Sequence, residues 1–364
     1  MRNIFTFICL GTLFLFSCLT QPEKNQSKSS SLYQSLSDGG LKIEPEKFTK
    51  ISGMPDVSLT ERLMLKFKDS IIYVFDWEQQ FLLLFSWEGE FLQQIGGKGE
   101  GPGEIDGVSG FDVFGDIITF LRPAGNESII YRFRDTGEFL EQRKIEVSAG
   151  AFIQTGPSSY VFDSGYNVEE NDHQLYKYNL NDSSLVGILP HVVTVPKMPM
   201  EGSSLTHISS DEYIFWPTYR PTLNYYVNDK LNHTFDMDYG PYLLGEDFDV
   251  MPPMEAAEHA FSNGFYQPST FISNGDYLLI QGALVKSFDD QGIYITLADL
   301  KNNQYDSKKL EQGTFDEALL SFYSFDENYI YSLADGYILE KFTANSDLGD
   351  MKGNYYLVRS KMEH

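Results

Sequence analysis

The chain has almost no cysteine. Its only two, Cys9 and Cys18, both lie within the first eighteen of 364 residues. The rest of the chain therefore has no thiol for a disulfide, a nucleophile or a metal ligand. Cysteine-dependent catalysis and zinc–thiolate sites are excluded for this part of the sequence.

Basic residues are scarce as well. The sequence has 27 Lys and Arg against 52 Asp and Glu, which gives a formal net charge of −25. A surface this acidic repels nucleic acid and anionic lipid, so we expect neither as a partner of the globular part. Solubility alone is a sufficient reason for the acidic composition.

Signatures of catalysis are also missing. The histidines show neither His-x-x-x-His nor His-x-His spacing, and no Gly-x-Ser-x-Gly elbow occurs. We therefore expect no metal, no cofactor and no catalytic residue. The histidines are His173, His191, His207, His233, His259 and His364.

The one long apolar run is at the start. Ile4 to Phe16 follows the charge of Arg2 and is too short for a stable membrane span, which is typical of a signal peptide. Leu15-Phe16-Ser17-Cys18 resembles the lipobox of bacterial lipoproteins. The resemblance implies an acylated Cys18 as the first mature residue, and an ordinary secretory signal is the alternative.

These features predict three regions. Residues 1–17 are the signal peptide, whose removal takes away Arg2 and changes the net charge from −25 to −26. Residues 18–40 hold the lipidated cysteine and a polar, serine-rich tether. Residues 41–364 form the folded domain, held in the cell envelope by its acyl chains alone, on the periplasmic side or at the cell surface.

Six short β-rich phrases recur along the folded part, each after a polar turn. Their starts are 43 to 64 residues apart, close to the period of four-stranded propeller blades. We therefore predict an all-β, six-bladed propeller. The phrases are Ile71–Asp76, Asp116–Leu121, Ser159–Asp163, Glu212–Trp216, Asp276–Ile280 and Asn328–Ser332.

Ring closure and one interruption complete the predicted fold. Leu41–Ile51 is strand-like and precedes the first blade, so we expect it to pair with the last blade, Leu319 to about Arg359. Residues 239–268 interrupt the repeat between blades four and five. Within them, Met254–Phe261 reads as a short helix that ends at Asn263-Gly264. Such an insertion is either a binding loop or a cover for one end of the ring.

A glycine-rich stretch follows the first phrase. Ile95-Gly-Gly-Lys-Gly-Glu-Gly-Pro-Gly-Glu104 lacks the Gly-Lys-Ser/Thr that opens the helix of a phosphate loop, so we interpret it as the link between blades one and two. Together with the lipobox and Gly-Glu-Phe-Leu, it resembles the six-bladed β-propeller lipoproteins of Gram-negative bacteria, relatives of the NHL-repeat propellers. The resemblance implies a cell-envelope propeller and specifies no activity.

The repeat also predicts a candidate ligand site. Turns from the second to the third strand of each blade and links between blades emerge at the same end of a propeller. Cationic and aromatic side chains at these positions suit a planar, carboxylated or sugar-like ligand, although the arginines also suit ion pairs with neighbouring acids. The predicted residues are Trp77, Lys98, Arg122, Tyr166, Tyr219 and Arg220.

Two functions remain open at this point. The first is a monomeric, non-catalytic module that binds or scaffolds a protein, peptide or glycan. The alternative is a propeller enzyme, a lyase or hydrolase with its site at the channel mouth. The missing nucleophile and metal signatures favour binding.

Overall fold

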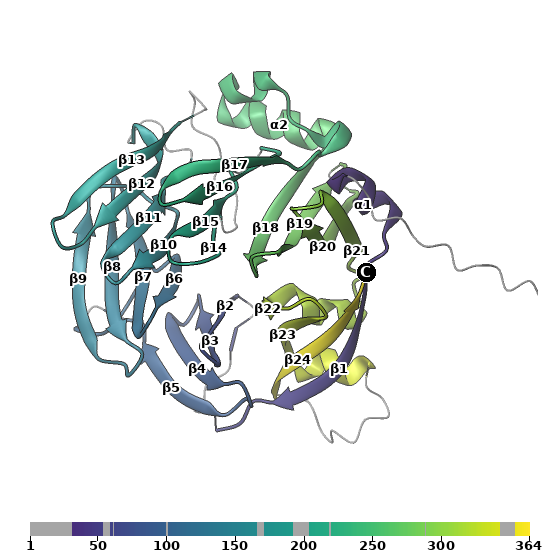
Figure 1. Cartoon of the computed structure of the whole chain (residues 1–364). Helices are drawn as coiled ribbons and strands as arrows, with labels where there is room; N and C mark the ends of the chain where they lie inside the picture. Colours follow the sequence, from purple (N-terminus) through teal and green to yellow (C-terminus); the bar gives the residue numbers. More distant parts are fainter. Residues whose placement is uncertain are drawn as a thin grey trace, which may run out of the picture.

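The structure is a computed structural model. It describes residues 31–53, 59–60, 62–99, 101–165, 171–191, 204–217, 220–287, 289–342 and 354–364. In these residues, twenty-four strands form six four-stranded antiparallel sheets arranged as blades around one axis (Figure 1). The predicted all-β, six-bladed propeller is confirmed.

Blades one to three follow the chain in order. Blade one has β2 (Leu63–Lys68), β3 (Ile71–Asp76), β4 (Phe81–Ser86) and β5 (Phe91–Gly96). Blade two has β6 (Gly110–Phe114), β7 (Ile117–Ala124), β8 (Glu127–Arg134) and β9 (Phe139–Ile145). Blade three has β10 (Ala151–Gly156), β11 (Ser159–Asp163), β12 (His173–Asn179) and β13 (Ser184–Pro190).

The remaining blades use the rest of the chain and its start. Blade four has β14 (Leu205–His207), β15 (Glu212–Phe215), β16 (Thr222–Val227) and β17 (Lys230–Asp236). Blade five has β18 (Phe265–Ser273), β19 (Tyr277–Val285), β20 (Gln291–Asp299) and β21 (Gln304–Lys309). Blade six has β22 (Phe322–Phe325), β23 (Tyr329–Asp335), β24 (Tyr355–Glu363) and β1 (Lys42–Lys50).

The ring closes as predicted. β1 runs antiparallel to β24, with Lys42 opposite Glu363 and Lys50 opposite Tyr356. The outermost strand of blade six therefore comes from the beginning of the domain and its other three strands from the end (Figure 1).

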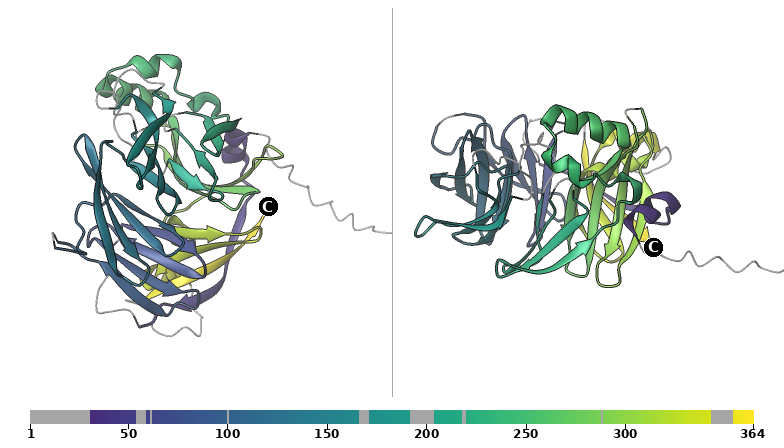
Figure 2. Two further views of the ribbon diagram at one scale, coloured as in Figure 1. Left: turned by 60° about the vertical axis from the view of Figure 1, so that its left-hand side comes forward. Right: turned by 90° about the horizontal axis from the view of Figure 1, so that it is seen from above.

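Each recurring phrase forms, or overlaps, the second strand of its blade. That strand is buried on both faces, because neighbouring blades cover it on either side. In β3, Ile72 and Val74 pack into the cluster shared with blade six, and Tyr73 and Phe75 into the cluster shared with blade two. Successive side chains of such a strand therefore point alternately into the hydrophobic cores on its two faces, and this is why the whole strand is apolar. Figure 2 shows the blades from the side, packed face to face.

The glycine-rich stretch is the link between β5 and β6, as predicted. The Glu104 carboxylate accepts the Gly101 backbone N–H at 2.7 Å. A Cβ added at Gly99 would lie 2.1 Å from a Glu104 oxygen, so this position has no room for a side chain while the carboxylate is in place. Glu104 therefore closes the turn.

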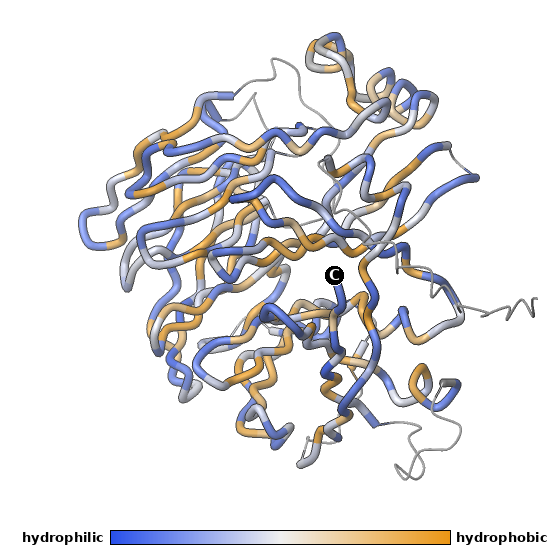
Figure 3. The backbone as a smooth tube through the Cα atoms, turned by 45° about the vertical axis from the view of Figure 1, so that its right-hand side comes forward, coloured by the Kyte–Doolittle hydropathy of each residue, from blue (hydrophilic) through white to orange (hydrophobic). Residues whose placement is uncertain are grey.

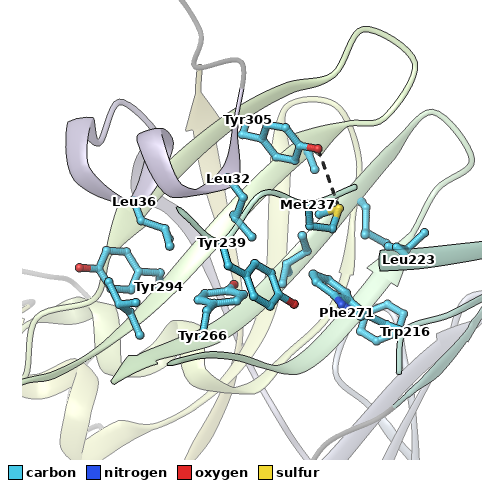
Figure 4. Packing of buried hydrophobic residues seen from close by; sticks show 14 of the residues in the cluster. Leu32, Leu36, Trp216, Leu223, Met237, Tyr239, Tyr266, Phe271, Tyr294 and Tyr305 are labelled. Carbon is cyan, nitrogen blue, oxygen red and sulfur yellow. Dashed lines mark hydrogen bonds between the residues drawn. The ribbon is translucent and has the colours of Figure 1, made fainter. Parts of the chain in front are cut away.

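Part of the range predicted as a tether, 18–40, forms a helix instead. Helix α1 (Leu32–Asp38) begins at the N-cap Ser31 and packs into the core between blades four and five through Leu32 and Leu36 (Figure 4). The Ser35 hydroxyl shares a hydrogen bond of 2.7 Å with that of Ser307 in β21. The sequence of α1 has only two aliphatic residues, Leu32 and Leu36, so it gives little indication that the helix packs against the blades.

The insertion also differs from its predicted limits. It contains the 3₁₀ helices η1 (Gly240–Tyr242) and η2 (Glu246–Val250), followed by α2 (Pro253–Asn263), with Gly264 as C-cap at φ 77°. The short helix and its glycine stop are confirmed. Phe265–Pro268 instead belongs to β18, since it pairs with Val285–Gly282 of β19. Figure 3 shows apolar residues on this projecting segment.

Two further helices lie in blade six, η3 (Phe315–Ser321) before β22 and α3 (Gly336–Phe342) after β23. Within the described ranges, no helix has the length and apolar content needed to cross a bilayer.

Candidate functional site

The innermost strands of four blades meet at one buried carboxylate. Asp112 on β6 accepts a hydrogen bond from Lys66 Nζ on β2 at 2.6 Å. The same carboxylate accepts the Gln154 backbone N–H from β10 at 2.6 Å, and His207 Nε2 on β14 lies 2.8 Å from it. Asp112 therefore joins blades one to four at the axis of the propeller, and we call these four residues the axial cluster.

Asp112 is held in its ionised form. Burial opposes the charge, but the charges and hydrogen bonds of Lys66 and His207 outweigh it and hold the Asp112 pKa well below its usual range. Because an ionised carboxylate only accepts hydrogen bonds, His207 Nε2 carries the proton that faces Asp112.

In the axial cluster the carboxylate of Asp112 is buried, whereas the hydrogen-bond donors Lys66 and His207 are partly exposed to solvent. The Asp112 side chain is 3% exposed, against 32% for Lys66 and 28% for His207. An ammonium group has three donors and Asp112 takes one at 2.6 Å. The chemistry left at the surface of the axial cluster is that of a site for an anionic group.

A second buried acid lies at the end of β11. Asp163 accepts the Gly165 N–H at 2.8 Å and the Ser204 hydroxyl at 2.5 Å, which joins blade three to the residue before β14. Here burial dominates these hydrogen bonds and raises the Asp163 pKa to about 6. Asp112 and Asp163 are thus buried carboxylates with opposite shifts, because only Asp112 has cationic partners.

Histidines gather at the same end of blade three. Burial, with the nearby His173, lowers the pKa of His191. His191 Nε2 lies 3.5 Å from the Ser164 hydroxyl, but that hydroxyl donates to the His173 carbonyl at 2.8 Å. The Ser164 proton is therefore directed to the backbone, which is not the geometry of a serine activated by a histidine base.

The predicted ligand residues of blades one and two lie at the expected end of the fold. Trp77 directly follows β3, half-buried, with the Arg62 guanidinium 5.3 Å from its ring centroid. Lys98 is exposed on the glycine-rich link. The Arg122 side chain lies against Gly107 of the same link, 3.5 Å from a Cβ built there, and donates to Tyr131 Oη at 3.3 Å.

Arg220 belongs to the corresponding connection in blade four, before β16. Its carbonyl accepts the Trp216 indole N–H and the Tyr239 hydroxyl, both at 3.0 Å, so the backbone here is fixed from two sides. The topology places Arg220 at the same end of the propeller as the residues of blades one and two. Tyr166, Tyr219 and Cys18 lie outside the described residues. The joint role of the six predicted residues stays a prediction.

Among the described residues, no three His, Cys, Asp or Glu side chains are grouped as metal ligands would be.

A family model described as 6-bladed beta-propeller, DUF5128, matches residues 55–248. The chain belongs to this family. The matched stretch covers blades one to four and therefore contains the whole axial cluster. No curated protein matches the chain.

Two solved structures from Bacteroides share the fold. One is a Bacteroides fragilis protein predicted to be exported, 16% identical, with a TM-score of 0.62 over 89% of this chain and 96% of that one. The other is a member of the DUF4221 family from Bacteroides vulgatus, 10% identical, with a TM-score of 0.57 over 89% of this chain and 98% of that one. At these identities the likeness shows the fold alone.

Sequence reasoning missed the axial cluster. Its members are separated by 46, 42 and 95 residues from Asp112, and no spacing motif joins them. The one local signal is Asp112 itself, an acid between Phe111 and Val113 in a strand that is otherwise apolar. An acid buried there requires partners from other blades.

Proposed function

We propose that the protein is a monomeric cell-envelope lipoprotein that binds a protein, peptide or glycan without catalysis. The acylated Cys18 is its anchor. The ligand is received at the end of the propeller that carries Trp77, Lys98, Arg122 and Arg220, and an anionic group of the ligand extends along the axis towards the axial cluster.

The observation that supports this proposal is that the cationic side chains of the axial cluster are partly exposed to solvent while its carboxylate is buried. Lys66 and His207 keep about a third of their side-chain surface while the acid between them is covered. Exposed donors lower the desolvation cost of the ion pair, and they are also what a site for an anionic group needs. The aromatic ring of Trp77, with Arg62 over it, adds a planar contact surface of the kind that sugars and peptides use.

A ligand panel tests the proposal. Acidic peptides and uronic-acid oligosaccharides should bind the purified protein, and their neutral counterparts should bind at least about tenfold more weakly, because a charge-assisted hydrogen bond is lost. Replacing Arg122 and Arg220 together by alanine should weaken binding. The matched control is Arg134→Ala with Arg143→Ala, which removes the same charge from two exposed positions of blade two.

Three outcomes count against the proposal. Unchanged affinity in the folded Arg122/Arg220 variant removes this end of the propeller from consideration. Equal losses in the control variant show an effect of net charge only. Turnover of any member of the panel favours the lyase or hydrolase alternative instead.

Lipidation is tested separately. Acyl labelling in cells should mark the wild type and not Cys18→Ser, and globomycin should block maturation. A wild type that is secreted without acyl chains would leave the binding proposal intact and remove the anchor.

A further inference from the structure

We infer that the outer surface of the insertion, formed by η2, α2 and the residues before η2, binds a cationic amphipathic segment of a partner protein. This docking surface comprises Leu243, Val250, Met254 and Phe261 with the acids around them. It lies outside the axial cluster and does not depend on the proposed ligand.

Helix α2 buries its small residues and exposes its large ones. Ala256 and Ala260, four residues apart, are buried against Phe265 and Val285. Met254 and Phe261, seven residues apart and so on one side of the helix, point outwards, with Met254 71% exposed. A helix that served only to cover the propeller would place these two side chains inwards, because each would contribute more buried apolar area than an alanine.

Neighbouring residues extend the exposed apolar surface. Val250 at the end of η2 is 62% exposed, and Leu243 is 49% exposed. Four large apolar side chains are thus exposed within one segment of about twenty residues, and such a concentration of exposed apolar side chains is typical of interaction sites.

The surface is held in a defined position. The Tyr33 ring of α1 packs at 5.9 Å from that of Tyr242, and the Tyr33 N–H donates to the Asp238 carbonyl at 3.0 Å. The Phe261 ring packs edge-on against Phe265 at 5.6 Å. Since Gly264 ends α2 directly before β18, the helix is fixed to the inner strand of blade five.

The negative charge of the insertion indicates which kind of partner the docking surface binds. Thr234–Gly264 contains seven Asp or Glu and neither Lys nor Arg. Five of the seven acids are exposed, namely Asp236, Asp238, Asp247, Glu255 and Glu258. Like charges oppose both an anionic bilayer and a second copy of this surface. An amphipathic helix with Lys or Arg beside an apolar stripe matches both the apolar residues and the acids.

A designed peptide tests the surface directly. The probe is a fluorescent amphipathic helix of Leu and Lys, compared with a Leu and Glu peptide and with a Ser and Lys peptide of equal length. Only the Leu and Lys peptide should bind the full chain, and raising ionic strength from about 0.05 to about 0.5 M should weaken it.

Two variants and two matched controls locate the binding. Met254→Ser with Phe261→Ser should weaken the Leu and Lys peptide at least about tenfold, and Asp247→Asn with Glu258→Gln should weaken it severalfold and flatten its salt dependence. The controls are Leu92→Ser with Val186→Ser, exposed apolar residues of other blades, and Glu88→Gln with Glu90→Gln, exposed acids of blade one. Both controls should bind like the wild type.

Each contrary result overturns the inference. Absence of binding by the wild type, equal binding after Met254→Ser with Phe261→Ser, or equal losses in the controls would show that the surface does not select such a segment. Recruitment to phosphatidylethanolamine–phosphatidylglycerol vesicles that is lost in this variant would identify lipid as the occupant. A dimer that the same variant dissociates would identify a second copy.

Discussion

Asp163 gives the sharpest test of the electrostatics, because replacing it should stabilise the protein. Its folded-state pKa of about 6 lies about two units above the ordinary value of 3.8. At about 1.4 kcal/mol per unit, ionising this buried group costs the folded state about 3 kcal/mol above pH 6.

The direction in which stability changes with pH follows from proton binding by Asp163 in the folded and unfolded states. Between the two pKa values the folded state holds the proton more tightly than the unfolded state, so this contribution makes the protein more stable as pH falls from about 6 to about 4. The penalty is complete near pH 7.5 and about half as large near pH 5.

Asp163→Asn keeps the local geometry while removing the charge. Its carbonyl oxygen accepts the Gly165 N–H in place of the carboxylate, and its amide donates to the Ser204 hydroxyl, which also accepts. We therefore expect the free energy of unfolding to rise by about 1–3 kcal/mol at pH 7.5, and by about half that amount at pH 5.

The measurement is urea unfolding of both proteins at each pH, with the difference between them as the result, since other titrating groups then cancel. A variant less stable than the wild type at pH 7.5 would refute the reasoning. So would a difference that is the same at both pH values.

Two further predictions use other parts of the ring. Asp112→Asn should destabilise the protein by about 1–3 kcal/mol near pH 7 in the same assay, because it removes charge-assisted hydrogen bonds from Lys66 and His207, whose side chains keep about a third of their surface in solvent; a neutral result would show that the pair contributes little. Since the Asp112 pKa is lowered, its contribution should persist above about pH 4 and be lost as pH falls below that value. Deleting Lys42–Lys50 should abolish cooperative unfolding of the whole domain, since β24 loses its partner, and circular dichroism with urea would reveal a surviving five-bladed fold if this is wrong.

The fold was predictable because a propeller repeats one local pattern. Each second strand is buried between two blades, so runs such as Ile71–Phe75 are continuously apolar and recur every 43 to 64 residues. Turn residues and the Asn263-Gly264 stop mark where strands and helix end. These are local signals, and a single sequence carries them.

The site was less predictable because its contacts are long-range. Arg122 and Arg220 could be assigned to one end of the ring from the register of the repeat alone. Asp112, Lys66 and His207 could not be joined, because inner strands of different blades come together only when the ring is complete. The docking of α1 was missed for the same reason, since Leu32 and Leu36 meet blades four and five from far away in the sequence.

The pairing of β1 with β24 has a consequence for how the chain folds. β1 is made before any blade, yet its partner is the last strand of the domain. Contacts between such distant residues slow folding, because a large loop must close before they form. During synthesis, β1 and the growing edge of the ring stay unpaired, and exposed edges of this kind favour aggregation. We therefore expect protection from proteolysis to appear only once β24 has been made and can pair with β1.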